Sequence, residues 1–119
     1  MGNEPCADNY GPVNVMKFRE RIFQETEREK AQDYLWNELV LLQSQTIRTV
    51  KGLEYTYQIR GNEMFVSRKT KSITKVSVDL ALEKIIELSG EVAGPKKLKC
   101  FGASYLYPIF IEMGLIKNS

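Results

Sequence analysis

Hydrophobic residues recur at helical intervals along the first part of the chain, in two groups. The groups are Met16, Phe18, Ile22 and Phe23, followed by Ala31, Tyr34, Leu35, Leu39 and Leu42. Residues 24–30 between them are wholly polar, a pattern given by one long helix with a solvated middle or by two helices joined there. Because neither Gly nor Pro interrupts the run, we favour one long N-terminal helix, straight or gently bent, capped by Asn14. A helix of about 30 residues extends about 45 Å, so its apolar ends need a cover, and a homodimer through this helix is a hypothesis.

The central sequence predicts a β-hairpin. Residues 53–60 and 63–68 alternate between apolar and polar side chains, and Gly61-Asn62 separates them, as in a tight hairpin turn. The predicted pairs are Arg60 with Glu63, Ile59 with Met64, Tyr57 with Val66, and Glu54 with Lys69. One face would carry Leu53, Tyr55, Tyr57, Ile59, Met64 and Val66, and the β-prone residues 46–50 are a candidate third strand. Trp36 marks a contact surface if it is exposed, and is core if the hairpin covers it.

Two shorter helices are predicted after the hairpin. The first is capped by Ser72 or Thr74 and ends at Gly90. Its expected core stripe is Ile73, Val76, Leu80, Ala81, Ile85 and Leu88. Gly94-Pro95 indicates a loop, and the last helix runs from residue 103 or 104 to 113, with a kink or a later start at Pro108.

The pattern therefore predicts an α+β fold with a long N-terminal helix, a β-hairpin or small antiparallel sheet, and two shorter C-terminal helices. Residues 1–13 are expected to form a flexible N-terminal tail, and residues 14–119 a single α+β domain. The 119 residues are 43% hydrophobic and 27% charged, which fits one globular domain. The polar N-terminus lacks the features of a signal peptide, and no apolar run approaches the roughly 20 residues that cross a bilayer. We expect a cytoplasmic protein with no membrane partner.

The residue types narrow the possible chemistry. Histidine is absent, which removes Ser-His-Asp and Cys-His catalysis and the HExxH zinc motif. An enzyme would depend on carboxylates, lysine or tyrosine, and no local signature of one is present. Cys6 and Cys100 lack metal-binding spacing, and two reduced thiols are favoured over a disulfide. We therefore expect no enzyme activity, no catalytic residues, no metal site and no cofactor.

Basic residues are concentrated in the second part of the chain. Residues 1–50 hold 6 Lys and Arg against 8 Asp and Glu, whereas residues 51–119 hold 11 against 7. The densest clusters lie beside a predicted helix start, whose N–H groups favour phosphate, and beside a group of aromatic residues. The candidate nucleic-acid-binding residues are Arg68, Lys69, Lys71, Ser72, Thr74, Lys75, Lys96, Lys97 and Lys99.

Two stretches resemble bacterial helix-turn-helix repressors. Residues 72–84 resemble the recognition-helix segment, in which a helix start rich in Ser and Thr precedes Val and Ala at helical spacing. Residues 99–116 resemble the sequence of Gly, a small residue, Ser, an aromatic-rich helix and Gly-Leu-Ile found in the same class, although Pro108 departs from it. The resemblance implies a DNA-binding or regulatory module that docks a helix on DNA.

The same residues also admit structural interpretations. In one of these, Ser72 and Thr74 serve only as helix caps, with the nearby cations solvated. The aromatic cluster of Phe101, Tyr105, Tyr107 and Phe110 either stacks on single strands or forms core, and core is favoured. We therefore expect a small non-catalytic, helix-turn-helix-like module with DNA as its partner. The alternative is a protein–protein interaction module, an adaptor or inhibitor, that acts through the long helix or a sheet edge.

Overall fold

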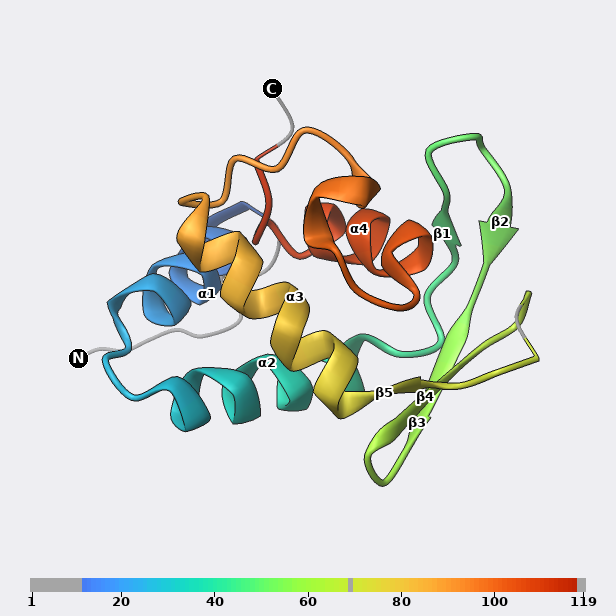
Figure 1. Cartoon of the computed structure of the whole chain (residues 1–119), viewed down its shortest axis with the longest axis horizontal. Coiled ribbons are helices and arrows are strands. Elements are labelled where there is room, and N and C mark those ends of the chain that lie inside the picture. The colour runs from blue at the N-terminus through green and yellow to red at the C-terminus, as the bar shows by residue number, and fades with distance from the viewer. Residues whose placement is uncertain (1–11, 69, 118–119) are drawn as a thin grey trace.

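The computed structural model describes residues 12–68 and 70–117, and its fold is α+β. Helices occupy one side of the molecule and two small sheets the other (Figure 1). The helices are α1 (Pro12–Gln24), α2 (Arg28–Leu42), α3 (Lys75–Glu87) and α4 (Ala103–Glu112), with a short 3-10 helix, η2 (Pro95–Leu98). The strands are β1 (Ile47–Arg48), β2 (Glu54–Tyr55), β3 (Tyr57–Arg60), β4 (Glu63–Val66) and β5 (Ile73–Thr74). Both sheets are antiparallel, one of order β1-β2 and the other β3-β4-β5.

The N-terminal helical stretch is two helices, so the prediction of one long helix is wrong. Glu27 has an extended backbone, with φ −95° and ψ 118°, and its N–H donates to the Glu25 carboxylate at 3.2 Å. This local bond gives the backbone an alternative to continuing the helix. The break lets α1 fold back on α2, and the Phe18 and Tyr34 ring centroids lie 5.2 Å apart. Apolar residues of both helices join one core within the subunit, including Phe18, Ile22, Leu35 and Leu39, and the homodimer stays a prediction.

The helical stretch also begins earlier than expected. α1 starts at Pro12, two positions before the predicted cap at Asn14, and Pro suits a first helical position because its fixed φ matches the helix. The rest of the predicted N-terminal tail, including Cys6, lies outside the described residues.

The hairpin has the predicted register. Tyr57 pairs with Val66, Ile59 with Met64, and Arg60 with Glu63, as the turn at residues 61–62 requires. The predicted third strand forms as β1, but it pairs with β2 in a separate sheet. The third strand beside the hairpin is β5, which pairs with β4. A start of the next helix at Ser72 had been one of the two predictions for these residues. Lys69, the expected partner of Glu54, lies outside the described residues, and the Glu54 carboxylate lies 2.7 Å from Arg48 Nη2.

Three polar groups on aromatic side chains join the sheets to the helices. Trp36 Nε1 donates to the Gly61 carbonyl at 3.1 Å, and the hairpin buries the ring, so this tryptophan is core. The Tyr57 hydroxyl donates to the Leu39 carbonyl at 2.7 Å, close to the end of α2. The Tyr55 hydroxyl donates to the carbonyl of Tyr105 in α4. Each bond gives a buried or partly buried side-chain donor its acceptor. Together the three bonds fix how the strands lie against α2 and α4.

Helix α3 begins where it was predicted, and Ala81 and Ile85 are buried as expected, but the rest of the buried face differs. The buried side chains are Val78, Ala81, Leu82 and Ile85. Val76 and Leu80, which were expected in the core, are 66% and 52% exposed, and Leu88 is also exposed. The expected stripe counted Ile73 as helical, whereas Ile73 belongs to β5 and is buried as a strand residue. Because the helix starts only after it, Ile73 does not set the rotation of α3.

Helix α4 runs through Pro108 and carries the most apolar part of the core. The side chains from Leu106 to Phe110 are buried, including Tyr107, whose hydroxyl donates to the Val92 carbonyl at 3.0 Å. Pro95 opens η2 in the stretch that was expected to be a loop. The chain returns beside the end of α3, where the Lys117 N–H donates to the Gly90 carbonyl at 2.7 Å. In the part of the chain that the structure describes, no helix is both long and apolar enough to cross a membrane.

Candidate nucleic-acid interface

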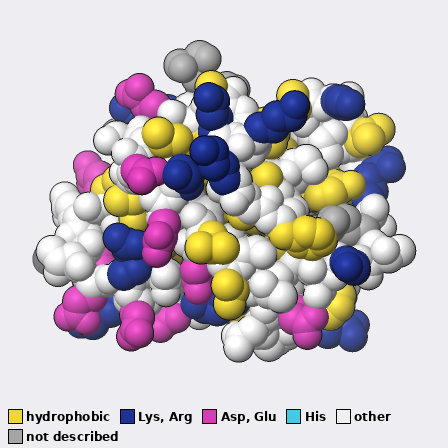
Figure 2. Space-filling view, viewed as in Figure 1, with side chains coloured by type: hydrophobic (Ala, Val, Ile, Leu, Met, Phe, Trp, Pro, Cys, Tyr) yellow, Lys and Arg dark blue, Asp and Glu magenta, His cyan; other side chains and the backbone are white. Residues whose placement is uncertain are grey.

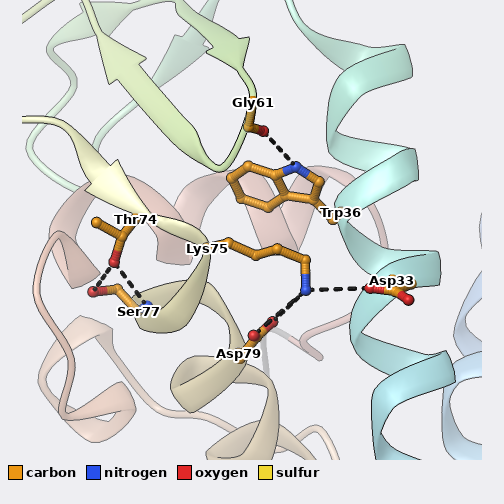
Figure 3. Close-up of polar contacts among 7 residues, drawn as sticks. All are labelled: Asp33, Trp36, Gly61, Thr74, Lys75, Ser77 and Asp79. Carbon is orange, nitrogen blue, oxygen red and sulfur yellow. Dashed lines mark hydrogen bonds and ion pairs between the residues drawn. The ribbon is translucent and has the colours of Figure 1, made fainter.

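Lys75, one of the predicted phosphate ligands, is held by two carboxylates at the start of α3 (Figure 3). Its Nζ lies 3.3 Å from Asp33 Oδ1 on α2 and 3.3 Å from Asp79 Oδ1, one turn along α3. Only 19% of the Lys75 side chain is exposed. Two nearby carboxylates already balance its charge, so Lys75 joins α2 to α3 and offers little attraction to a phosphate.

Protein groups also occupy the start of α3. The Lys75 N–H donates to the Asn62 carbonyl of the hairpin turn at 2.8 Å. The Ser77 N–H donates to the Thr74 hydroxyl at 3.3 Å, so Thr74 is the helix cap. The Ser72 hydroxyl donates to the Glu63 carboxylate. The first two bonds use helix N–H groups that an anion would otherwise need, and the third places a carboxylate beside the start of the helix.

The exposed face of α3 carries apolar and acidic side chains. Val76, Leu80, Glu83 and Glu87 are exposed along it. Lys84, the other described cation of the helix, lies 2.7 Å from the Glu87 carboxylate. A recognition helix needs hydrogen-bonding side chains for base edges and cations for phosphates. The carboxylates of Glu83 and Glu87 pair with Arg28 and Lys84, so these cations are not free to bind phosphate.

Arg68 and Lys71 are exposed at the exit of the hairpin. Arg68 Nε donates to the Glu54 carbonyl at 2.7 Å, which ties this side chain to β2. Lys69, between them in the predicted site, lies outside the described residues. Of the cations predicted here, the structure therefore places Arg68 and Lys71 at the surface and Lys75 within an ion-pair cluster.

The cluster around Lys75 predicts a pH effect on stability. Burial raises the pKa of the Asp79 carboxyl above its ordinary value of 3.8, and Lys75 opposes this shift. The folded state therefore holds this proton more tightly than the unfolded state does, and the stability that Asp79 contributes is lost as the pH rises through the raised pKa. We expect the free energy of unfolding, measured relative to an Asp79→Asn variant by urea titration, to fall as the pH rises from 3.8 and then level off. A difference that grows over this range would contradict the assignment.

Lys96 and Lys97 lie at a different place, where they line a groove together with Lys51. Lys51 belongs to the turn between β1 and β2, and the two others belong to η2. The groove has a volume of about 600 Å³ and is lined by residues 49–51, 53, 93–97, 104 and 105. We call it the lysine groove. Within the described residues, none of its three lysines takes part in an ion pair.

Local bonds fix both walls of the lysine groove. In the turn, the Thr49 N–H donates to the Leu53 carbonyl at 2.9 Å, and the Leu53 N–H donates to the Thr49 hydroxyl at 3.0 Å. Gly52 supplies the left-handed conformation that closes the turn, with φ +89°. The opposite wall begins with Pro95, whose ring fixes φ at the first position of η2. Lys51 is therefore presented from one ordered segment and Lys96 and Lys97 from another.

Most of the lining of the lysine groove is apolar. Val50 is 67% exposed and Leu53 is 48% exposed, although the alternating pattern had placed Leu53 on the buried face. Pro95 and the half-buried Tyr105 ring also line the groove. A neighbouring hollow of about 500 Å³ shares Val50 and residues 93–95, and continues toward Arg48. Exposed apolar side chains in a concave site favour ligands that are partly apolar.

The two walls hold cations without carboxylates. The residues that line the lysine groove include Lys51, Lys96 and Lys97 and no Asp or Glu. Arg48 lies outside it and pairs with Glu54, and Lys99 lies in another hollow with Glu87. In the upper right of Figure 2 the charged side chains in view are Lys and Arg, with hydrophobic side chains between them. The β1–β2 turn and the segment before α4 occupy that region in Figure 1. Charges of one sign in a concave site concentrate the local potential.

Lys99 and the four aromatic residues of the predicted site do not all join the lysine groove. Lys99 lines another hollow, with Lys84 and Glu87. The hydrogen bond and charge of Lys84, with a smaller contribution from Lys99, lower the pKa of Glu87. Of the four aromatic residues considered for stacking, Tyr107 and Phe110 are core, Tyr105 is half-buried and Phe101 is exposed. Lys51 was not among the predicted residues, because only the fold places it in the same groove as Lys96 and Lys97.

Other chemistry finds little support in the part of the chain that the structure describes. Among residues 12–68 and 70–117, no three His, Cys, Asp or Glu side chains are grouped to hold a metal ion. Burial raises the pKa of the Cys100 thiol to about 11, so this thiol is protonated at neutral pH. Comparison with known proteins finds no matching family model, no matching curated protein and no matching solved structure.

Proposed function

We propose that this protein is a small non-catalytic nucleic-acid-binding module whose contact surface is the lysine groove. The observation that carries the proposal is the convergence of Lys51, Lys96 and Lys97 on one apolar groove whose walls hold no carboxylate. Phosphate contacts by Lys and Arg supply most of the sequence-independent affinity for nucleic acids. The proposal keeps two residues of the predicted site, Lys96 and Lys97, and moves the centre of binding away from the start of α3.

The geometry favours the groove over the hairpin exit for an electrostatic reason. At the start of α3 the cation Lys75 faces Asp33 and Asp79, so a phosphate would meet carboxylates there. In the lysine groove the three ammonium groups have no such competitors among the described residues. A polyanion gains most where cations are unpaired, since binding then releases its counterions without breaking an internal ion pair.

Charge reversal in the groove is the test. We expect Lys96→Glu/Lys97→Glu to weaken binding to a labelled oligonucleotide at least about tenfold at low ionic strength, because two phosphate contacts are lost. Each lost contact should also lower the slope of log affinity against log salt by about 1. Fluorescence anisotropy over a series of salt concentrations measures both quantities. Arg28→Glu/Lys30→Glu on α2 is the control for net charge, because it changes the charge equally at exposed side chains outside the groove. It also removes ion pairs to Glu83 and Glu27, so Trp36 fluorescence must show that this variant is folded.

A third variant, Arg68→Glu/Lys71→Glu, tests the hairpin exit that the sequence favoured. If it weakens binding more than the groove variant does, the contact surface is at the hairpin and the groove assignment is wrong. Absence of binding to any oligonucleotide at low ionic strength would rule out the proposed function itself.

A further inference from the structure

We infer that the lysine groove holds unpaired bases, so that the protein binds single-stranded nucleic acid in preference to duplex. This inference rests on the proposed function and adds the class of ligand. Its starting point is that exposed apolar side chains and three lysines line one groove; the apolar set of Val50, Leu53, Pro95 and the Tyr105 ring is called the floor. Stacking of single strands was one of the sequence-based alternatives for the aromatic cluster at residues 101–110, and Tyr105 is the member of that cluster that lines the groove.

The apolar floor distinguishes the two ligands. A duplex turns its phosphates and sugars outward and keeps the faces of its bases stacked, so it offers no base face to cover Val50 and Leu53. An unpaired base has an apolar face that can lie on these side chains and release the water over them. The exposed fractions of Val50 and Leu53 show that no part of the described chain provides this cover.

Tyr105 gives the floor a fixed aromatic group. Its ring packs edge-on against Tyr55, with centroids 5.1 Å apart, and its carbonyl accepts the Tyr55 hydroxyl. Packing against a buried neighbour holds the Tyr105 ring in one orientation, while its half-buried position leaves part of it at the groove. A ring held in this way can contact a base without first losing conformational freedom.

The positions of the lysines agree with a strand that passes through the groove. Lys51 is carried by one wall, and Lys96 and Lys97 by the other. Phosphates that flank a base held on the floor would meet a cation on either side. The volume of about 600 Å³ lies within the range of sites that take an organic group of this kind.

The experiment compares affinities of the full-length protein for three labelled ligands. They are an unstructured pyrimidine strand of about 20 nucleotides, the duplex that it forms with its complement, and a polyglutamate peptide of similar length as a probe of charge alone. We expect the single strand to bind at least about tenfold more tightly than either of the others, as stacking of one base allows. Anisotropy at one salt concentration measures all three.

Variants of the floor separate base contact from charge. We expect Val50→Ser/Leu53→Ser to lower the affinity for the single strand to that for the duplex, and to leave the salt slope unchanged. Val76→Ser/Leu80→Ser on α3 is the matched control, because it removes two exposed apolar side chains elsewhere and should change neither affinity. All four substituted side chains are exposed, and the fluorescence of the buried Trp36 reports that each variant is folded.

Three results would overturn the inference: equal affinity for strand and duplex, polyglutamate binding as tight as strand binding, or an unchanged preference in the floor variant. The first and third leave the proposed function standing, since nucleic acid still binds. If neither nucleic acid binds, the proposed function fails and the inference fails with it.

Discussion

Gly102→Ala is expected to lower the free energy of unfolding by about 2–4 kcal/mol, the sum of a backbone cost and a packing cost. Gly102 has a φ of +81°, in the left-handed region that Ala adopts only with strain. A Cβ at this position would lie 2.4 Å from Ile73 Cδ1 and 2.7 Å from Ile73 Cγ1. Ile73 is fully buried, so its side chain can move only by disturbing the surrounding core.

Substitutions at two other glycines, Gly94 and Gly61, separate the backbone cost of Gly102→Ala from its packing cost. Gly94 has extended backbone, and no atom lies within 4 Å of the place that a Cβ would take, so Gly94→Ala should change stability by less than about 0.5 kcal/mol. Gly61 has a φ of +60° but open space around it, so Gly61→Ala should cost about 1 kcal/mol through backbone strain alone. Urea unfolding followed by Trp36 fluorescence measures all three. Equal losses for Gly102 and Gly61 would show that Ile73 does not restrict the site.

Lys75→Met is expected to lower the free energy of unfolding at neutral pH by about 2 kcal/mol, because it leaves Asp79 without its cation. The two side chains are 19% and 21% exposed, and burial already disfavours the ionised Asp79. Loss of one partner of a fully buried pair costs about 3–5 kcal/mol, and the remaining exposure here reduces the effect. Asp33 is 71% exposed and stays solvated in the variant.

The double variant Lys75→Met/Asp79→Leu provides the comparison. Replacing both members of a covered ion pair with apolar side chains is often neutral, so we expect the double variant to recover most of the lost stability. Equal stability of the single and double variants would mean that the two side chains are not coupled. Under the proposed function, Lys75→Met also leaves the affinity for oligonucleotides unchanged, whereas a phosphate ligand at Lys75 would make this variant bind more weakly.

The features that sequence predicted correctly depend on residues close together in the chain. The turn at residues 61–62 and the alternating strands fix the register of β3 and β4, because a shift by one residue would expose the buried face. The Thr74 cap depends on the Ser77 N–H three residues away. The extent of α4 likewise agrees with the local pattern, and its Pro108 lies within the helix.

The features that sequence missed depend on contacts between distant residues. Residues 24–30 suit one helix or two, and the packing of Phe18 against Tyr34 selects two. The buried face of α3 depends on where β5 ends, which in turn depends on its pairing with β4. Lys75 resembles any exposed lysine in sequence, and only the approach of α2 places Asp33 beside it.

The sequence alone determined the α+β class, the hairpin register and the surplus of cations after residue 50, because adjacent residues and composition are sufficient to specify them. The tertiary structure decided which cations are paired and which converge. It joined Lys75 to Asp33 and Asp79, and it brought Lys51 beside Lys96 and Lys97 over an apolar floor. The physical reason is that charge interactions depend on distance in space, and the fold sets that distance for residues far apart in the chain.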